Sequence, residues 1–232
     1  MAEAHPVGFQ WVMEAKARGA TVIHVDPRFT RTSAVADVHV PLRAGSDIAF
    51  LGGLINHVLT NELWFDDYVR NYTNAPFLVR EDFKDTEELG GLFSGFDPEK
   101  RTYETETWQY DGLHLGEDEQ DQEEQSIKYE QKGTGHQFGS GGAALDPGES
   151  LKDLTLQHPR CIFQVLKRHF ARYTPEMVQE TCGIPSELFA KVADALTSAS
   201  GRDRTAAFVY SVGWTQHSDG VQYIRTESIL QQ

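Results

Sequence analysis

Two stretches of the sequence carry side chains whose types and order suit an anionic ligand that contains a ring. In the first, Asp26 follows a run of β-branched residues, and Arg28 and Arg31 come directly after it. A carboxylate at the end of a strand accepts hydrogen bonds from ribose hydroxyls or a guanine edge, and guanidinium groups neutralise phosphate. A plain turn is the alternative for Asp26, because Asp-Pro is a common turn pair.

The same part of the chain offers a second candidate loop. Gly45 follows Arg43 and permits close approach of a ligand to the backbone. Asp47 then either accepts a hydrogen bond from a purine amino group or caps the helix that begins at Ile48. Arg43 is a third cation for phosphate, although surface ion pairing is the ordinary role of such residues.

The second stretch lies near the carboxyl end, at residues 213–217. Trp214, Gln216 and His217 offer an aromatic face and polar groups to a ligand. The alternative is a buried tryptophan beside a histidine whose hydrogen bonds are satisfied within the fold.

Hydrophobic periodicity predicts the elements that position these loops. A helix over 8–18, strands over 20–26 and 36–42, and a strand over 206–214 alternate with further helices, at 48–63, 65–72, 159–172, from 174, 185–198 and 219–232. This order indicates an α/β fold with a parallel sheet, in which the first strand is buried. Ligands bind such sheets at the carboxyl ends of the strands, which makes 25–28 and 212–217 the expected ligand loops.

Charge is concentrated in one segment of the chain. The 232 residues carry a formal net charge of -14, and residues 81–132 hold 17 acidic and 5 basic side chains. A glycine-rich stretch follows, so we expect three parts: an α/β part over 1–80, an acidic and glycine-rich insertion over 81–150, and a helical part over 151–232 that returns to the sheet. For the insertion, a solvated loop is favoured over a calcium site, because its acidic residues lack the spacing of a calcium loop.

Composition excludes several classes of protein. The acidic balance disfavours a general nucleic-acid binder, and no apolar run is long enough to span a bilayer. The first residues lack the pattern of a signal peptide. Cys161 and Cys182 are too few for a metal cluster, and the histidines show no metal-ligand spacing. The GSGGAA stretch at 139–144 fits a dinucleotide fingerprint but has no strand before it and no helix after it.

The sequence resembles the molybdopterin oxidoreductase superfamily, and within it the catalytic subunit of respiratory, nitrate-inducible formate dehydrogenase. The resemblance covers nearly the whole chain except about 115–150. It rests most specifically on DPRFTRT at 26–32, AGSD at 44–47 and GWTQHS at 213–218. It implies a Rossmann-like, cofactor-binding α/β domain with an acidic and glycine-rich insertion.

The resemblance also implies a cofactor, a reaction and partners. The cofactor is bis(molybdopterin guanine dinucleotide) with molybdenum or tungsten, and the reaction is oxidation of formate to carbon dioxide. Electrons leave through a 4Fe-4S cluster to an iron-sulfur beta subunit and a cytochrome b gamma subunit, at a periplasmic location. The cofactor contacts carried over to this sequence are Val25, Asp26, Arg28, Leu42, Gly45, Asp47, Val212, Gly213, Trp214, Gln216 and His217.

This sequence departs from the family's pattern in several places. It lacks the cysteine cluster for the iron-sulfur centre, the selenocysteine or cysteine that ligates the metal, the arginine of the substrate site and the carboxyl-terminal domain. We therefore expect an internal part of a longer subunit, with no catalytic and no metal-ligating residue of its own. A selenocysteine codon read as a stop upstream of Met1 is one hypothesis for its start. The alternative function is a non-catalytic nucleotide-binding or assembly module; a nicotinamide-dependent dehydrogenase is disfavoured.

Overall fold

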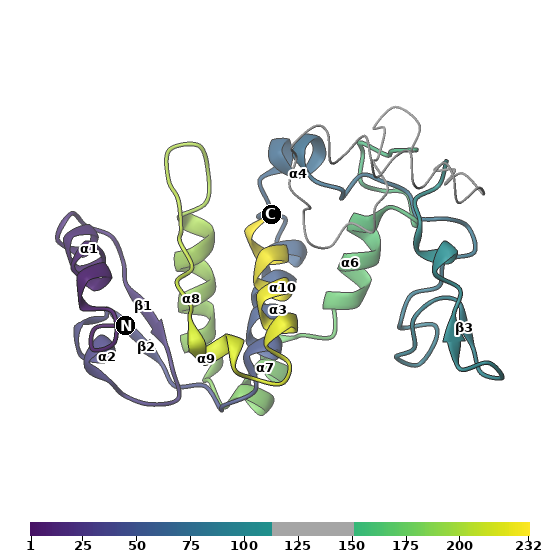
Figure 1. Cartoon of the computed structure of the whole chain (residues 1–232). Helices are drawn as coiled ribbons and strands as arrows, with labels where there is room; N and C mark the ends of the chain where they lie inside the picture. The colour runs from purple at the N-terminus through teal and green to yellow at the C-terminus, as the bar shows by residue number, and fades with distance from the viewer. Residues whose placement is uncertain (113–150) are drawn as a thin grey trace, which may run out of the picture. The chain divides into compact units, whose positions relative to one another are not determined.

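A computed structural model describes residues 1–112 and 151–232, which form two compact units. The first unit consists of Met1–Asn71 together with Lys167–Gln232, and the second of Tyr72–Leu166 (Figure 1). The first and third parts expected from the sequence thus both contribute to the first unit. The glycine-rich stretch and the GSGGAA motif lie outside the described residues.

The first unit begins with a small α/β arrangement. Helix α1 (Pro6–Ala17) precedes strand β1 (Ile23–Val25), helix α2 (Arg31–Val35) and strand β2 (Val38–Val40). The strands pair in parallel, with Ile23 opposite Val38 and Val25 opposite Val40, as the sequence predicts.

Two details of the sequence prediction are wrong in this region. Strand β1 is half-buried and becomes exposed at Val25, because β2 is its neighbour on one edge and no described strand lies on the other. The stretch between the two expected strands, for which the sequence predicts no helix, contains α2, where Ser33 Oγ accepts a hydrogen bond from Thr30 N–H at 2.8 Å. Such a reciprocal cap stabilises a short helix that lacks an apolar face.

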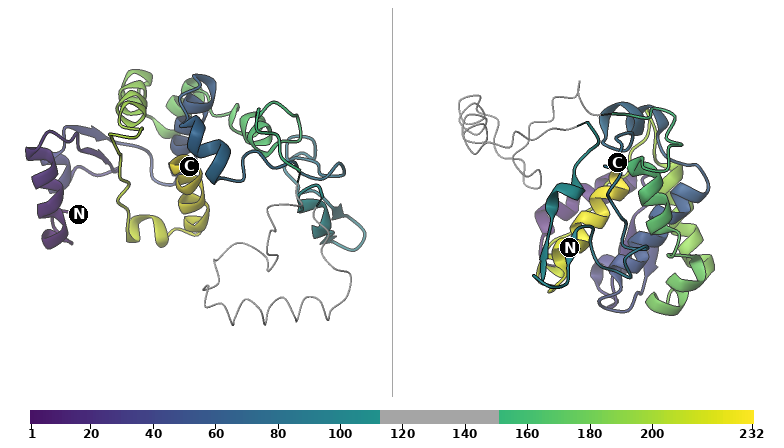
Figure 2. Two further views of the ribbon diagram at one scale, coloured as in Figure 1. Left: turned by 90° about the horizontal axis from the view of Figure 1, so that it is seen from above. Right: turned by 90° about the vertical axis from the view of Figure 1, so that its right-hand side faces the viewer.

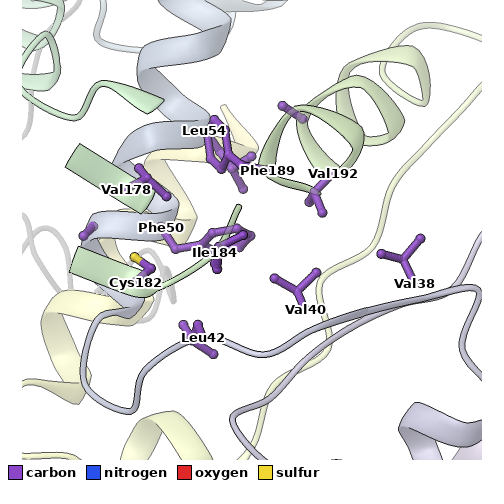
Figure 3. Close-up of a cluster of buried hydrophobic side chains, with 12 residues drawn as sticks. Val38, Val40, Leu42, Phe50, Leu54, Val178, Cys182, Ile184, Phe189 and Val192 are labelled. Carbon is purple, nitrogen blue, oxygen red and sulfur yellow. The ribbon is translucent and has the colours of Figure 1, made fainter. Parts of the chain in front are cut away.

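Four further helices supply the core of the first unit. They are α3 (Asp47–Thr60), α7 (Pro175–Cys182), α8 (Ser186–Ser198) and α10 (Gly220–Gln231). Helix α3 packs against the other three, and α10 runs beside it (Figure 1; Figure 2). Figure 3 shows where their apolar side chains meet the end of β2, in a cluster that includes Val38, Val40, Leu42, Phe50, Leu54, Val178, Cys182, Ile184, Phe189 and Val192.

The strand predicted over 206–214 is absent from the structure. Residues 206–211 have no strand partner among the residues that the structure describes, and the chain then forms the short helix α9 (Val212–Thr215). A strand requires a neighbouring backbone for its ladder, and no described segment supplies one here. Within the described ranges, the parallel sheet therefore has two strands, and the structure is α/β with a smaller sheet than the sequence suggests.

The second unit is ordered around aromatic side chains. Strands β3 (Phe96–Asp97) and β4 (Thr102–Tyr103) form a hairpin, followed by the 3-10 helix η1 (Thr105–Trp108). Phe93, Phe96, Tyr103 and Trp108 form a network of ring contacts at 5.2–6.3 Å. The range 81–112, expected to be part of a solvated insertion, thus contains a short hairpin and a 3-10 helix.

Arg160 joins two other segments of the chain within this unit. Its Nη1 donates to the Val79 carbonyl at 2.8 Å and to Asp111 Oδ2 at 2.7 Å. Two helices lie at the boundaries of the unit: α4 (Asp66–Tyr72) leads into it, and α6 (Ile162–Phe170) leads out of it. Of the helices in the described ranges, none combines the length and the apolar character needed to cross a lipid bilayer.

Helix α10 carries an acidic side chain into the interior of the first unit. Glu227 is 3% exposed, and its Oε1 has no hydrogen-bond partner among the described residues. Burial raises the pKa of this carboxyl, because a charged form without a partner is costly to desolvate. The folded chain therefore binds a proton at this carboxyl more tightly than the unfolded chain does.

We expect Glu227→Gln to remove a pH-dependent loss of stability. Since the folded pKa exceeds the unfolded one, wild-type stability is greatest below the unfolded pKa and falls as the pH rises through the folded pKa. The advantage of the variant in free energy of unfolding should thus grow as the pH rises from 4 to 8. Urea unfolding across this range measures it. Glu187→Gln, at an exposed position of α8, is the control, and its free energy of unfolding should change with pH as that of wild type does. If the free energies of Glu227→Gln and wild type differed by the same amount at every pH, the prediction would be contradicted.

Candidate functional site

The first candidate loop leaves β1 at Asp26 and folds back on itself. Asp26 N–H donates to the Val40 carbonyl at 3.1 Å, which ties the loop to β2. Asp26 Oδ1 accepts from Arg28 N–H at 2.8 Å, so this oxygen forms the turn that the sequence offered as an alternative. The carboxylate is partly exposed, and its Oδ2 lies 3.6 Å from His24 Nε2.

Two histidines beneath this loop were not singled out by the sequence analysis. His24 of β1 and His39 of β2 stack with their ring centroids 5.9 Å apart, and His39 Nε2 donates to the Asp26 carbonyl at 3.0 Å. Burial lowers the pKa of His24 more than Asp26 raises it. A signal in the sequence could have found them: the two short runs IHV and VHV each have a histidine in the middle, and these histidines lie opposite each other in the strand pair.

An open depression lies beside the first loop. Its volume is about 480 Å³, and it is lined by Glu3, Arg28, Phe29, Thr30, Arg31 and Ala34. Arg31 Nε lies 3.3 Å from Glu3 Oε1, with both side chains largely exposed. The Phe29 ring is 67% exposed and contacts His39 edge to face at 5.3 Å. Two guanidinium groups beside an exposed ring suit a ligand with both an anionic and a planar group.

The second loop follows β2 and leads into α3. The side chain of Leu42 is buried in the core, which leaves its backbone for any ligand contact. Gly45 has φ +86°, and no atom lies within 4 Å of the position where a Cβ would be. Open space therefore lies beside the backbone at the glycine that the sequence predicted as a point of close approach.

Arg43, which the sequence suggested as a third cation for phosphate, binds the end of helix α7. Its Nη1 donates to the carbonyls of Glu180 and of Thr181, the latter at 3.1 Å, and its N–H donates to the Cys182 carbonyl at 2.9 Å. The last carbonyls of a helix have no partner within the helix, so the guanidinium group satisfies the end of α7.

The third loop is held to the second by a hydrogen bond between distant residues. Trp214 Nε1, in α9, donates to Asp47 Oδ1 at 2.9 Å, and Tyr210 stacks on the Trp214 ring with centroids 4.8 Å apart. Asp47 is the first residue of α3 and binds Trp214, rather than capping the helix with its side chain. One face of the Trp214 ring is therefore already occupied, and the ring is half-buried.

His217 lies at the end of this loop and contacts α10. Its Nδ1 is 3.4 Å from the hydroxyl oxygen of Tyr223, which is fully buried. Burial, with a further effect from Asp219, raises the pKa of Tyr223 to about 12, so the phenol stays protonated. The side chains of Val212 and Gln216 are exposed, and a Cβ at Gly213 would meet no atom within 4 Å.

Hydrogen bonds and the chain itself thus connect the first loop to the second, and the second loop to the third. Asp26 connects the first loop to β2, the second loop continues from β2, and the Trp214–Asp47 bond connects the second loop to the third. The groups left for a ligand are the cations and ring around the depression, the Asp26 Oδ2 oxygen, the Gln216 amide and the open backbone at Gly45 and Gly213. In the ranges 1–112 and 151–232, no group of three or more His, Cys, Asp and Glu side chains is placed to hold a metal ion.

The chain is similar to curated proteins along nearly all of its length. It is 44% identical over 232 residues to the formate dehydrogenase-O major subunit of Escherichia coli (strain K12), an alignment that covers 99% of this chain and 19% of that protein. It is 44% identical over 231 residues to the nitrate-inducible formate dehydrogenase major subunit of the same organism, with the same coverage. The chain therefore spans about a fifth of the length of these relatives. No protein-family model matches it.

A solved structure shows a related fold. Acetylene hydratase from Pelobacter acetylenicus superposes with a TM-score of 0.52 over 96% of this chain and 18% of that chain, at 17% sequence identity. At this identity the likeness concerns the fold alone.

Proposed function

The chain is related by sequence to the major, catalytic subunits of formate dehydrogenases, and from this premise we propose that it is the part of such a subunit that holds the guanosine end of a bis(molybdopterin guanine dinucleotide) cofactor. The observation that carries the proposal is the joining of the three loops through Asp26 and through the Trp214–Asp47 bond. The loops follow β1, follow β2 and form α9, and the first two leave the carboxyl edge of the parallel pair, where ligands bind such sheets.

The described side chains fit the chemistry of a guanine dinucleotide. Arg28, beside the depression, provides a bidentate donor for phosphate, and Asp26 Oδ2 accepts from a ribose hydroxyl or a guanine edge. Gln216 offers both a donor and an acceptor. Gly45 and Gly213 have open space where a side chain would otherwise stand, so a ligand can approach the backbone there.

Other residues hold these groups in place or contact the ligand through their backbone. Asp47 orients Trp214, and Trp214 in turn fixes the start of the loop that carries Gln216 and His217. Val25, Leu42 and Val212 contribute backbone at the three loop starts. When bound, the cofactor supplies the metal, molybdenum or tungsten, that accepts electrons from formate; the residues of this chain bind and orient it.

The wider assignment follows the relatives. We propose that the complete subunit oxidises formate to carbon dioxide and passes electrons through a 4Fe-4S cluster whose ligands lie outside this chain. Its partners are then the remainder of the catalytic subunit, an iron-sulfur beta subunit and a cytochrome b gamma subunit, in an anaerobic respiratory complex that faces the periplasm. The support is the similarity to the major subunits named above.

Binding of GDP to the chain tests the nucleotide contacts. We expect GDP to bind more tightly than ADP, and Arg28→Ala to weaken GDP binding about tenfold, because a charge-assisted hydrogen bond to phosphate is lost. Isothermal titration calorimetry measures both. Arg18→Ala, at an exposed arginine that pairs with Glu14 on α1, is the control and should bind GDP as wild type does. Equal affinity of the two variants would contradict the assignment of Arg28.

A chimeric subunit separates the catalytic proposal from its alternative. In this chimera, the chain replaces its counterpart in the formate dehydrogenase-O major subunit of Escherichia coli. Bound molybdenum or tungsten together with formate-dependent dye reduction is the expected result. A chimera that binds GDP but neither metal would instead favour a non-catalytic nucleotide-binding or assembly module.

A further inference from the structure

Two histidines lie on one face of the parallel strand pair, beneath the first loop. His24 of β1 and His39 of β2 are opposite each other in the pair, and their rings stack at an interplanar angle of 26°. The His24 side chain is 16% exposed and reaches both Asp26 and helix α2. Histidine changes charge between about pH 5 and pH 8, so a mostly buried histidine beside a carboxylate is able to control that carboxylate.

The ring of His24 lies between the cap of α2 and the carboxylate of Asp26. Its Nδ1 is 2.9 Å from Ser33 Oγ, which is a hydrogen bond, and its Nε2 is 3.6 Å from Asp26 Oδ2, which is too long for one. Asp26 Oδ1 already accepts from Arg28 N–H at 2.8 Å. A guanosine contact through this side chain therefore depends on Oδ2, the oxygen that faces His24.

Ser33 allows His24 to take either charge state. A hydroxyl has one proton to donate and two lone pairs, and Ser33 Oγ uses one lone pair to accept from Thr30 N–H at 2.8 Å. When the ring is neutral, the hydroxyl donates to Nδ1 and the ring proton is on Nε2, because a lone pair on Nε2 would repel the carboxylate. When the ring is protonated, Nδ1–H donates to the second lone pair. The ring thus gains a proton without moving away from Ser33.

The charged groups around His24 decide when it changes state. Burial has the largest effect and lowers its pKa, Asp26 opposes this, and His39 and the amino group of Met1 lower the pKa further. Helix α2 faces the ring with the uncharged hydroxyl of Ser33. The ring is therefore neutral at neutral pH and becomes a cation beside Oδ2 in acid.

We propose that His24 is a positioning residue for the Asp26 carboxylate: its neutral ring leaves Oδ2 to the guanosine of the ligand, and its protonated ring draws Oδ2 away. This inference rests on the proposed function, in which Asp26 contacts guanosine. The protonated Nε2–H has to approach Oδ2 by only about 0.8 Å to form a charge-assisted hydrogen bond. The nucleotide site is thus sensitive to protons, with tighter binding at neutral pH and weaker binding in acid.

Calorimetric titration of the chain with guanosine at pH 8 and at pH 5 tests the inference. Guanosine is the probe because it carries no phosphate, a group that itself changes charge near about pH 6. The affinity of wild type should fall about tenfold from pH 8 to pH 5, because the hydrogen bond from guanosine to the charged Oδ2 is lost. The affinity of His24→Gln should change less than about twofold, since glutamine takes up no proton in this range.

Two other histidines provide matched controls. His57→Gln, in the last turn of α3, should show the same fall as wild type. His39→Gln keeps His24 and should also show the fall, because glutamine still donates to the Asp26 carbonyl that His39 Nε2 contacts at 3.0 Å. A wild-type affinity that is constant or rises in acid would overturn the proposal. A fall that persists in His24→Gln and is lost in His39→Gln would assign the response to His39 and would also overturn it.

Nuclear magnetic resonance of the His24 ring gives a second measurement that needs no variant. Coupling between two binding events is reciprocal, so protonation that weakens guanosine binding requires guanosine to weaken protonation. Saturating guanosine should therefore lower the pKa of His24 by an amount that matches the tenfold change in affinity. A pKa of His24 that is unchanged or raised by guanosine would refute the proposal.

These outcomes separate the inference from the proposed function. Guanosine that binds equally well at both pH values would refute control by His24 and leave the nucleotide site standing. Guanosine that binds at neither pH would refute the nucleotide site, and the inference would fall with it. If guanosine binding responds to pH through His24 while the chimera neither holds a metal nor oxidises formate, the inference stands and the catalytic assignment fails.

Discussion

Replacing Phe189 with alanine is expected to lower the free energy of unfolding of the chain by about 3–5 kcal/mol. The side chain is 2% exposed and lies at the centre of the core of the first unit (Figure 3). Its ring meets that of Phe50 edge to face, with centroids 6.1 Å apart and an interplanar angle of 82°. Truncation removes both the buried apolar surface and this contact, and leaves a cavity in the core.

Urea unfolding followed by circular dichroism measures the loss. Phe29→Ala is the matched control, because the Phe29 side chain is 67% exposed, and it should cost less than about 1 kcal/mol. A loss for Phe189→Ala no larger than that of the control would show that α8 does not pack on α3 as described.

Replacing Gly53 with alanine is expected to destabilise the chain by about 1–3 kcal/mol, although alanine favours a helix over glycine by about 1 kcal/mol. A Cβ at this position would lie 2.5 Å from Val178 Cγ2 and 3.1 Å from Phe189 Cζ. Helix α3 therefore approaches α7 and α8 too closely for any side chain, and the substitution must push the helices apart.

The control for this prediction is the same substitution in another helix. At Gly8 of α1, the nearest atom to an added Cβ is Met1 Cε at 3.6 Å, an ordinary contact. Gly8→Ala should thus raise the free energy of unfolding by up to about 1 kcal/mol. Thermal unfolding of the two variants should shift in opposite directions; a shift in the same direction would contradict the close packing at Gly53.

Local signals in the sequence were sufficient to predict the longer helices, although not the short helices α2 and α9. Thr174 and Pro175 predicted the start of α7, and Thr174 Oγ1 indeed accepts from Met177 N–H at 3.2 Å. A helix start depends on a few neighbouring residues, so composition and spacing specify it. The parallel pairing of the two short strands was also predicted correctly, because the alternation of strands and helices along the chain is typical of an α/β fold with a parallel sheet.

Features that depend on distant partners could not be predicted in the same way. The run at 206–214 has strand composition, but its state depends on whether a neighbouring backbone is present. The bond between Trp214 and Asp47 joins residues 167 positions apart, and Arg43 binds the end of a helix more than 130 positions away. The sequence therefore indicated candidate loops for a site, while the contacts between these loops required the structure.

The division of the first unit into two stretches determines the order in which it can fold. Val38, Val40 and Leu42 pack against side chains of α7 and α8, yet the second unit lies between these elements in the chain. During synthesis, residues 1–71 therefore emerge with their apolar faces uncovered until residues 167–232 have been translated. Contacts between distant positions in the chain also make folding slow, because the chain loses the entropy of loop closure before the stabilising contacts form. A ribosome-bound intermediate of this chain thus presents the surface that chaperones recognise, for as long as the second unit takes to be made.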